Sequence, residues 1–225
     1  RIWHFGKILR LGTALIVATI TQAPAPSMAE RLRTAIGAIF TFIGNVGLFA
    51  GIALLLGIGS SWYMIEIGTP LTTVKAGPWI SWPAAGTPHA DPYTRARTAR
   101  HGSLPLSGTV AQVWEARTDN EGQRLHSSCD YAVTGRGLYE GWWSIAVYDD
   151  QGHLIPNAAG RHAFNSSTIM RRPDGSFLVT LARDARPGNW LPTGGAGRLT
   201  LVLTIIEGGD VTGTGLPEIR RVACR

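Results

Sequence analysis

The sequence lacks the short motifs by which several enzyme classes are recognised. It contains no Gly-x-Ser-x-Gly segment, the turn that exposes the nucleophile of α/β-hydrolases. It also contains no His-Glu-x-x-His zinc motif and no glycine-rich phosphate-binding loop. The sequence therefore indicates no reaction class, no metal and no cofactor, and we expect a protein that is not an enzyme.

Cysteine is scarce, because only Cys129 and Cys224 occur in the 225 residues. They do not form a Cys-x-x-Cys pair, so neither a redox motif nor a zinc ribbon is indicated. In an oxidising compartment, two thiols in one domain with no odd cysteine left over favour a disulfide. We expect a Cys129–Cys224 bond that ties the C-terminus to a strand in the middle of the domain.

Charge is absent between Arg33 and Glu66. The apolar segment 34–65 exceeds the ~20 residues that a helix needs to cross a bilayer, which predicts a transmembrane helix followed by a linker over 66–76. Arginines precede the span, and the next basic residue after it is Lys75. The positive-inside rule then keeps the N-terminus in the cytoplasm and places the rest outside, in the periplasm of a bacterium, with the helix in the inner membrane.

Two features of the N-terminal part stay open. Residues 1–33 are a cytoplasmic or signal-like segment: "LGTALIVATI" resembles the apolar part of a signal peptide, Met28 would suit the start of a single-pass anchor, and a second span over 8–23 is the alternative. Within the predicted span, Gly47 and Gly51 have the spacing of a helix dimerisation face, although glycines are scattered through this segment.

The formal net charge of +6 does not indicate a nucleic-acid partner. Residues 1–33 carry five basic residues against Glu30 alone, whereas 16 basic residues face 14 acidic ones from Glu66 onward. A nucleic-acid binder carries its basic excess on the folded domain, where phosphates are contacted. The placement of the charge therefore argues against nucleic acid and leaves the membrane as the predicted partner.

Short strands and turns dominate residues 77–225. "TVAQVWEA" and "HSSCDYAV" flank a turn signal at 119–122, which predicts a hairpin, and similar turns are expected at 149–152 and 173–176. "RLTLVLTII" is apolar on both faces, as in a central strand. One helix is predicted over 91–101, with Asp91 as N-cap. The pattern predicts an all-β domain, either a β-sandwich or a barrel.

Polar residues give weaker signals. His153 and His162 are close in sequence, but metal sites need clustered ligands. Asp149 and Asp150 could act as paired carboxylates, yet neighbours on a strand point to opposite faces, and the glycine that follows indicates a turn. Ser144 has no evident base. We interpret all of them as structural or surface residues.

Tryptophan is more informative. Alternation along the predicted strands assigns Trp114 and Trp143 to the core. Trp190 lies in the glycine-bounded stretch "RPGNWLPTGG" and is a candidate for the rim of a ligand pocket, although a buried anchoring role explains it as well.

A series of short motifs runs in a fixed order through residues 76–222. They are Gly77-Pro78-Trp79, Asp91-Pro92-Tyr93, Arg95-Ala96-Arg97, Cys129 with Tyr131, Trp142-Trp143-Ser144, Tyr148, Ile155-Pro156-Asn157, Arg161, Phe164-Asn165-Ser166, Asp174-Gly175 and Asn189-Trp190-Leu191-Pro192. As a set they resemble the family called domain of unknown function 1214. One departure lies at 203–206, where an Arg and an aromatic residue are expected.

The resemblance implies a jelly-roll-like β-sandwich behind an N-terminal anchor, with no established activity. Its motifs include six residues that we take as candidate ligand-binding residues: Trp142, Tyr148, Arg161, Asn165, Asn189 and Trp190.

Three functions are compatible with these observations. The leading hypothesis is a membrane-anchored periplasmic module that binds a ligand such as an envelope glycan, lipid or protein. The alternative is a periplasmic hydrolase or carbohydrate-active enzyme in which Arg161, Asn165 and Asn189 converge on a jelly-roll pocket. A purely structural role in the envelope is the third.

Overall fold

The computed structural model describes residues 26–102, 106–136, 138, 141–206 and 215–225. The chain divides into two compact units, Arg1–Leu55 and Leu56–Arg225. The alternative second span over 8–23 lies outside the described residues. Within them, the first unit consists of helix α1, and the second contains the end of α1, helix α2 and all the strands.

Helix α1 (Met28–Glu66) includes the whole charge-free segment. Its N-terminus is fixed by a reciprocal capping box, in which the Ser27 amide donates to Glu30 Oε2 at 2.9 Å and the Glu30 amide donates to Ser27 Oγ at 3.3 Å. None of its side chains is buried, although an 18-residue stretch of it has a mean hydropathy of 2.2. Of the described helices, this one is long and apolar enough to cross a membrane. Helix α1 is therefore a candidate membrane anchor.

Helix α2 (Pro92–His101) confirms the prediction for this segment. Asp91 is its N-cap, because Asp91 Oδ1 accepts the amides of Tyr93 and Thr94 at 2.9 and 3.0 Å. The helix ends at Gly102, whose φ of 61° lies in the left-handed region that favours glycine at a helix C-terminus. Local sequence signals thus determine both ends of α2.

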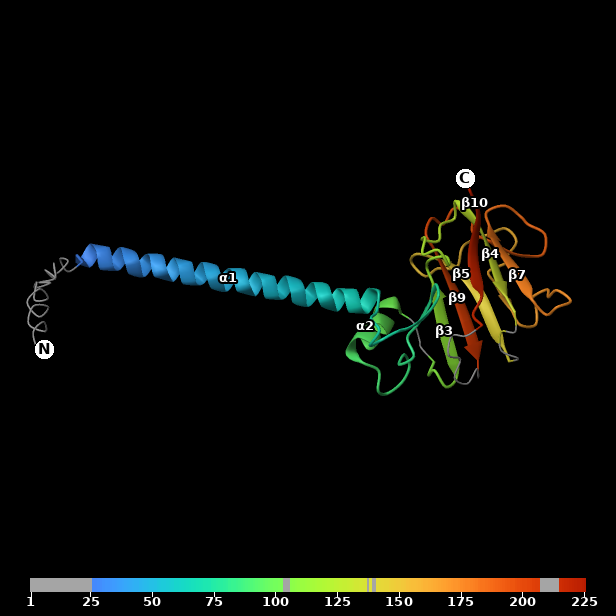
Figure 1. Ribbon diagram of the computed structural model, residues 1–225, viewed down its shortest axis with the longest axis horizontal. Coiled ribbons are helices and arrows are strands. Elements are labelled where there is room, and N and C mark those ends of the chain that lie inside the picture. The colour runs from blue at the N-terminus through green and yellow to red at the C-terminus, as the bar shows by residue number, and fades with distance from the viewer. Residues whose placement is uncertain (1–25, 103–105, 137, 139–140, 207–214) are drawn as a thin grey trace, which may run out of the picture. The chain divides into compact units, whose positions relative to one another are not determined.

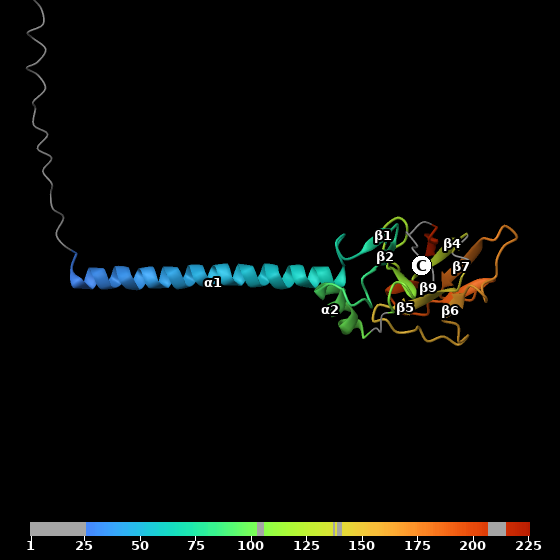
Figure 2. The same cartoon turned by 90° about the horizontal axis from the view of Figure 1, so that it is seen from below.

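The described strands form two sheets (Figures 1 and 2). The six-stranded sheet has the spatial order β1 (Val74–Ala76), β2 (Trp79–Ser81), β3 (Ala111–Ala116), β9 (Leu199–Ile206), β5 (Trp143–Asp149) and β6 (Ala163–Asn165). The four-stranded sheet has the order β10 (Glu218–Cys224), β4 (Cys129–Gly135), β7 (Phe177–Ala182) and β8 (Asn189–Pro192). Neighbouring strands are antiparallel except for β7 and β8, which are parallel.

Both sheets contribute alternate residues to one hydrophobic core. Trp143 on β5 is fully buried, as predicted, and its indole stacks on the Phe177 ring of β7 with centroids 5.1 Å apart. Gly135 faces Phe177 across the β4–β7 pair, and a Cβ at that glycine would lie 2.4 Å from the ring. The close approach therefore requires glycine. Strand β9 lies between β3 and β5, which confirms the prediction of a central strand.

The predicted hairpin between the segments on either side of residues 119–122 is wrong. Strand β3 pairs with β2 and β9, whereas β4 pairs with β10 and β7 in the other sheet. The turn itself forms, closed by a bridge between Thr118 and Arg124. Leu125 then accepts a hydrogen bond from the Leu199 amide at 3.1 Å before the chain crosses over. Each strand buries its apolar face in the shared core, and local turn signals do not determine its partner.

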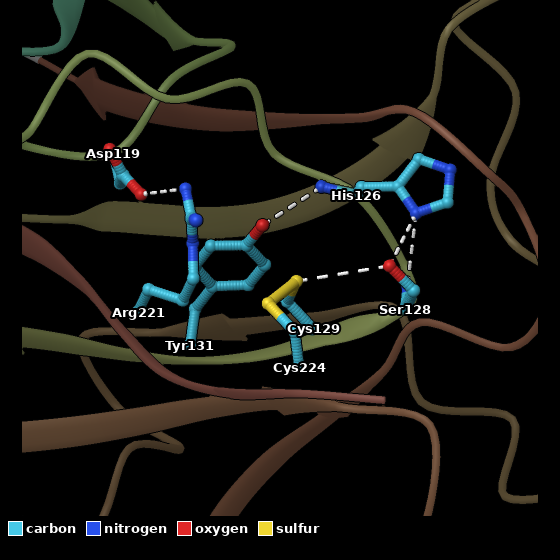
Figure 3. Close-up of a disulfide and its surroundings, with 7 residues drawn as sticks. All are labelled: Asp119, His126, Ser128, Cys129, Tyr131, Arg221 and Cys224. Carbon is cyan, nitrogen blue, oxygen red and sulfur yellow. Dashed lines mark hydrogen bonds and ion pairs between the residues drawn. A yellow bond between two sulfur atoms is a disulfide. The ribbon is translucent and has the colours of Figure 1, made fainter.

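The disulfide between Cys129 and Cys224 joins β4 to β10. Figure 3 shows its surroundings, where the His126 amide donates to the Tyr131 hydroxyl at 3.0 Å. Arg221 on β10 forms an ion pair with the buried carboxylate of Asp119 at 2.8 Å. The C-terminal strand is thus held to the domain by a covalent bond and by an ion pair, as well as by its sheet partner.

Candidate binding cavity

Asn189, the first residue of β8, is buried and fully hydrogen-bonded within the domain. Its Oδ1 accepts the Met170 amide at 2.8 Å, and its Nδ2 donates to the carbonyls of Met170 and Leu178 at 2.8 and 2.9 Å. Only 5% of the residue is exposed. Asn189 therefore joins the segment before β7 to the start of β8, and its amide group is used in that connection.

The two candidate tryptophans lie in different sheets. Trp190 on β8 is partly buried, and its Nε1 donates to the Ala182 carbonyl of β7 at 3.0 Å. Trp142, directly before β5, is 42% exposed, and its carbonyl accepts the Ile206 amide at 2.9 Å. The indole of Trp190 is thus used to hold β8 against β7, whereas the Trp142 ring is open to solvent.

Arg161 and Asn165 have local partners as well. Asn165 Oδ1 accepts the amides of Ser167 and Thr168 at 3.0 and 2.9 Å, which closes a turn at the end of β6. The exposed guanidinium of Arg161 lies 5.6 Å from the centre of the Phe164 ring. The structure does not bring Arg161, Asn165 and Asn189 together around the cavity described next; of the six candidates only Tyr148 lines it.

A cavity of about 1080 Å³ lies over the outer face of the six-stranded sheet. Its floor contains outward side chains of the three central strands, namely Val113 and Glu115 of β3, Thr200, Val202 and Thr204 of β9, and Tyr148 of β5. Its walls contain Thr94, Arg97, Thr98 and His101 of α2, the segment 81–87 in part, and residues 106–109. The cavity lies entirely within the second unit.

Strand alternation explains why these residues line the floor. In β9, Leu201 and Leu203 are fully buried in the core, so their neighbours Thr200, Val202 and Thr204 point to the other face. The antiparallel register places Thr200 opposite Tyr148 and Thr204 opposite Val113. The floor thus alternates hydroxyl-bearing and aliphatic side chains.

Arg97 of α2 forms one wall and is 6% exposed. Its Nη2 donates to Glu115 Oε2 at 2.9 Å, and its Nη1 donates to the Glu66 carbonyl at 3.0 Å. Its guanidinium also lies 3.8 Å from the centre of the Trp82 ring. Because the last carbonyls of a helix have no partner within it, Arg97 caps the C-terminus of α1 while it contacts the cavity floor.

Burial affects the charges around Arg97. It lowers the pKa of Arg97 itself, and Glu115 opposes that shift. The imidazole of His101 has a pKa lowered by burial and by the positive charge of Arg97. Since an ordinary histidine titrates near pH ~6.5, His101 is neutral at pH 7. The cavity wall therefore carries the arginine charge but not a histidine charge.

The adjacent aspartates also line the cavity, but Asp149 belongs to a turn. Asp149 Oδ1 accepts the amides of Gln151 and His153 at 2.9 and 2.8 Å. Asp150 is exposed. Within the described ranges, no three His, Cys, Asp or Glu side chains gather as metal ligands.

Most of the cavity residues carry no signal in the sequence. The outward threonines of β9 lie in an apolar strand, and the sequence does not show what covers a sheet face. The Arg95-Ala96-Arg97 motif was the one available signal, since its last arginine lies in the cavity wall.

Comparisons with known proteins address the family and the fold. Residues 110–209 match the model of the family described as "Protein of unknown function (DUF1214)", which confirms the resemblance. The crystal structure of the VPA0106 protein from Vibrio parahaemolyticus is similar with a TM-score of 0.51 at 21% identity, over 60% of this chain and 36% of that one. The crystal structure of an uncharacterised protein from Burkholderia cenocepacia has a TM-score of 0.36 at 20% identity, over 51% of this chain and 30% of that one.

The chain thus spans about a third of the length of these two solved proteins. No curated protein matches it. The likeness to the Vibrio protein supports the fold of the second unit and assigns no ligand.

Proposed function

Residues 110–209 belong to the DUF1214 family, and on that premise we propose that the protein is a membrane-anchored periplasmic module that binds an envelope glycan in the cavity. Helix α1 is the anchor, with Arg31 and Arg33 on its cytoplasmic side. The disulfide fits an oxidising compartment outside the cytoplasm.

The observation that carries the proposal is the hydroxyl-bearing floor of the cavity. Thr200 and Thr204 point into it from β9, and among the described residues their hydroxyls have no hydrogen-bond partner. A volume of about 1080 Å³ suits a ligand of several sugar rings. Sugar hydroxyls both donate and accept hydrogen bonds, as threonine hydroxyls do. The floor is therefore complementary to a glycan.

The proposed architecture is a jelly-roll-like β-sandwich. The chain passes from β3 to β4, β5 and β7 by alternating between the two sheets, and β9 inserts between β3 and β5. Such crossing connections between two sheets are typical of jelly rolls. The parallel β7–β8 pair is a local departure from the antiparallel pattern.

A cavity-filling substitution tests this function. The full chain in nanodiscs is applied to an array of bacterial envelope saccharides, with lipids and envelope proteins assayed in parallel. We expect saccharide binding that Thr204→Trp abolishes, because the indole occupies the floor. Thr134→Trp, on β4 of the other sheet, is the matched control and retains binding. Saccharide binding that survives in Thr204→Trp, or binding only of lipids or proteins, would contradict the proposal.

A further inference from the structure

One end of the cavity carries a guanidinium that is only weakly paired. Arg117 follows Ala116, which is fully buried in the core, so Arg117 points to the outer face and lines the cavity. Its Nη2 lies 3.5 Å from Glu115 Oε2, while Arg97 donates to that same oxygen at 2.9 Å. The single carboxylate of Glu115 thus forms ion pairs with two arginines, and 32% of the Arg117 side chain remains exposed.

The backbone places further arginines beside this end. The Leu125 amide donates to the Arg117 carbonyl at 3.0 Å, and Arg124 forms a β-bridge with Thr118, so the backbone of Arg124 lies close to that of Arg117. Arg198 lies close to this segment, because it forms a β-bridge with His126. Burial and the positive charges of Arg117 and Arg198 lower the pKa of Arg124, and Asp150 opposes this shift. Three arginines thus gather along this edge, of which Arg117 lines the cavity together with Arg97 and the acidic residues Glu115, Asp149 and Asp150.

We propose that the cavity binds an acidic saccharide, and that Arg117 holds its anionic group, a sugar carboxylate or a sugar phosphate. This proposal rests on the glycan-binding function proposed above and specifies the class of glycan. A guanidinium forms two parallel charge-assisted hydrogen bonds with either anion, because a carboxylate and a phosphate each present two oxygens side by side. Arg117 can form them because its contact with Glu115 is long, at 3.5 Å.

The rest of the floor suits the sugar rings that carry such a group. Tyr148 and Thr200 form a register pair that lines the cavity. Hydroxyl groups beside an arginine fit a polar acid, whereas the hydrocarbon chain of a fatty acid would leave Thr200 and Thr204 unpaired on its surface.

The test compares ligands that differ only in charge. The full chain is placed in nanodiscs of the neutral lipid phosphatidylcholine, and affinities are measured for tetragalacturonate, its methyl ester, maltotetraose and phosphorylated maltotetraose. We expect an acidic member of at least one pair to bind at least tenfold more tightly than its neutral counterpart. The pair in which this occurs distinguishes a carboxylate from a phosphate. The preference should weaken as salt is added.

Variants then assign the preference to a residue. Arg117→Gln lowers the affinity for the preferred acidic probe about 10- to 100-fold and leaves its neutral counterpart unaffected. Arg117→Lys, which keeps the charge and loses the planar fork, gives an intermediate loss. Arg172→Gln is the matched control, because Arg172 is exposed and lies outside the cavity lining; it changes neither affinity. Thermal unfolding of each variant confirms that it is folded.

The outcomes separate this proposal from the one on which it rests. Saccharide binding that Thr204→Trp abolishes, but with equal affinity for acidic and neutral partners or with no loss in Arg117→Gln, overturns the acidic class and leaves glycan binding intact. Absence of binding for every probe here and for every saccharide of the envelope array overturns both proposals.

Discussion

Arg97 joins three parts of the second unit through one side chain. It caps the end of α1 through the Glu66 carbonyl, pairs with Glu115 on β3 and lies on the Trp82 ring. Removing one partner of a buried ion pair leaves the other charge uncompensated, which costs ~3–5 kcal/mol. We therefore expect Arg97→Ala to lower the free energy of unfolding by about this amount, measured by denaturant titration of the full chain in detergent.

Arg95 on the same helix provides the control for Arg97. Its exposed guanidinium donates to the Pro88 carbonyl at 2.7 Å. Arg95→Ala should change the free energy of unfolding by ~1 kcal/mol or less. Equal losses for the two variants would show that the contacts of Arg97 are no more stabilising than one exposed hydrogen bond.

The two candidate asparagines have different structural roles, and this difference can be measured. Asn189→Ala removes the three hydrogen bonds that this nearly buried side chain makes with Met170 and Leu178, so we expect a loss of ~2–4 kcal/mol in the free energy of unfolding. Asn165→Ala removes hydrogen bonds of a partly exposed turn and should cost ~1 kcal/mol. Denaturant titration compares the two. A larger loss for Asn165 would contradict the structural role of Asn189.

The sequence indicated that Asn189 and Trp190 have a role, but it did not show whether that role is structural or in ligand binding. A motif residue that holds two backbone segments and one that contacts a ligand look alike in a sequence. The hydrogen bonds of Asn189 to Met170 and Leu178 depend on a chain path that no local pattern shows.

At the level of elements, the N-cap of α2 gives a prediction on pH. Burial raises the pKa of Asp91, but hydrogen bonds from Thr94 and Tyr93 outweigh it and lower the pKa overall. A carboxyl whose pKa is lower in the folded protein stabilises above its unfolded pKa of ~3.9. That contribution is lost as the pH falls through the lower, folded pKa.

Asp91→Ala should therefore lower the free energy of unfolding by ~0.5–2 kcal/mol at pH 7. The difference from the unmodified chain should shrink as the pH falls below ~4. Denaturant titrations between pH 2.5 and 7 measure it. Asp91→Asn keeps an N-cap acceptor without a charge, so its stability relative to Asp91→Ala should not depend on pH. A constant difference between Asp91 and Asp91→Ala over this range would contradict the role of the carboxylate.

Elements with signals inside their own sequence were predicted well. Helix α2 carries its N-cap and its glycine C-terminus, and β9 carries the apolar pattern of a central strand. Pairing was predicted less well, because β3 and β4 are adjacent in sequence but belong to different sheets. A strand with one buried face gains the same apolar burial in either sheet, so the turn between the two strands does not decide their partners.

At the level of the molecule, the cavity depends on segments far apart in sequence. Its floor comes from β3, β5 and β9, and its wall from α2. The resemblance predicted that the domain would have two sheets, but not which outer face would be covered. Where α2 covers this face, Arg97 pairs with Glu115, and the two residues are separated in the sequence by the end of α2, a loop and part of β3.

The oxidation state of the cysteines tests on which side of the membrane the domain lies. If the positive flank of α1 stays in the cytoplasm, the domain with Cys129 and Cys224 enters the oxidising periplasm and the disulfide forms. We expect thiol alkylation of the full chain in growing bacteria to find both cysteines oxidised, and a C-terminal alkaline phosphatase fusion to be active. Replacing Arg31 and Arg33 by glutamate weakens the positive flank, so a reduced, inactive fraction should appear. Free thiols in the unmodified chain would contradict periplasmic placement.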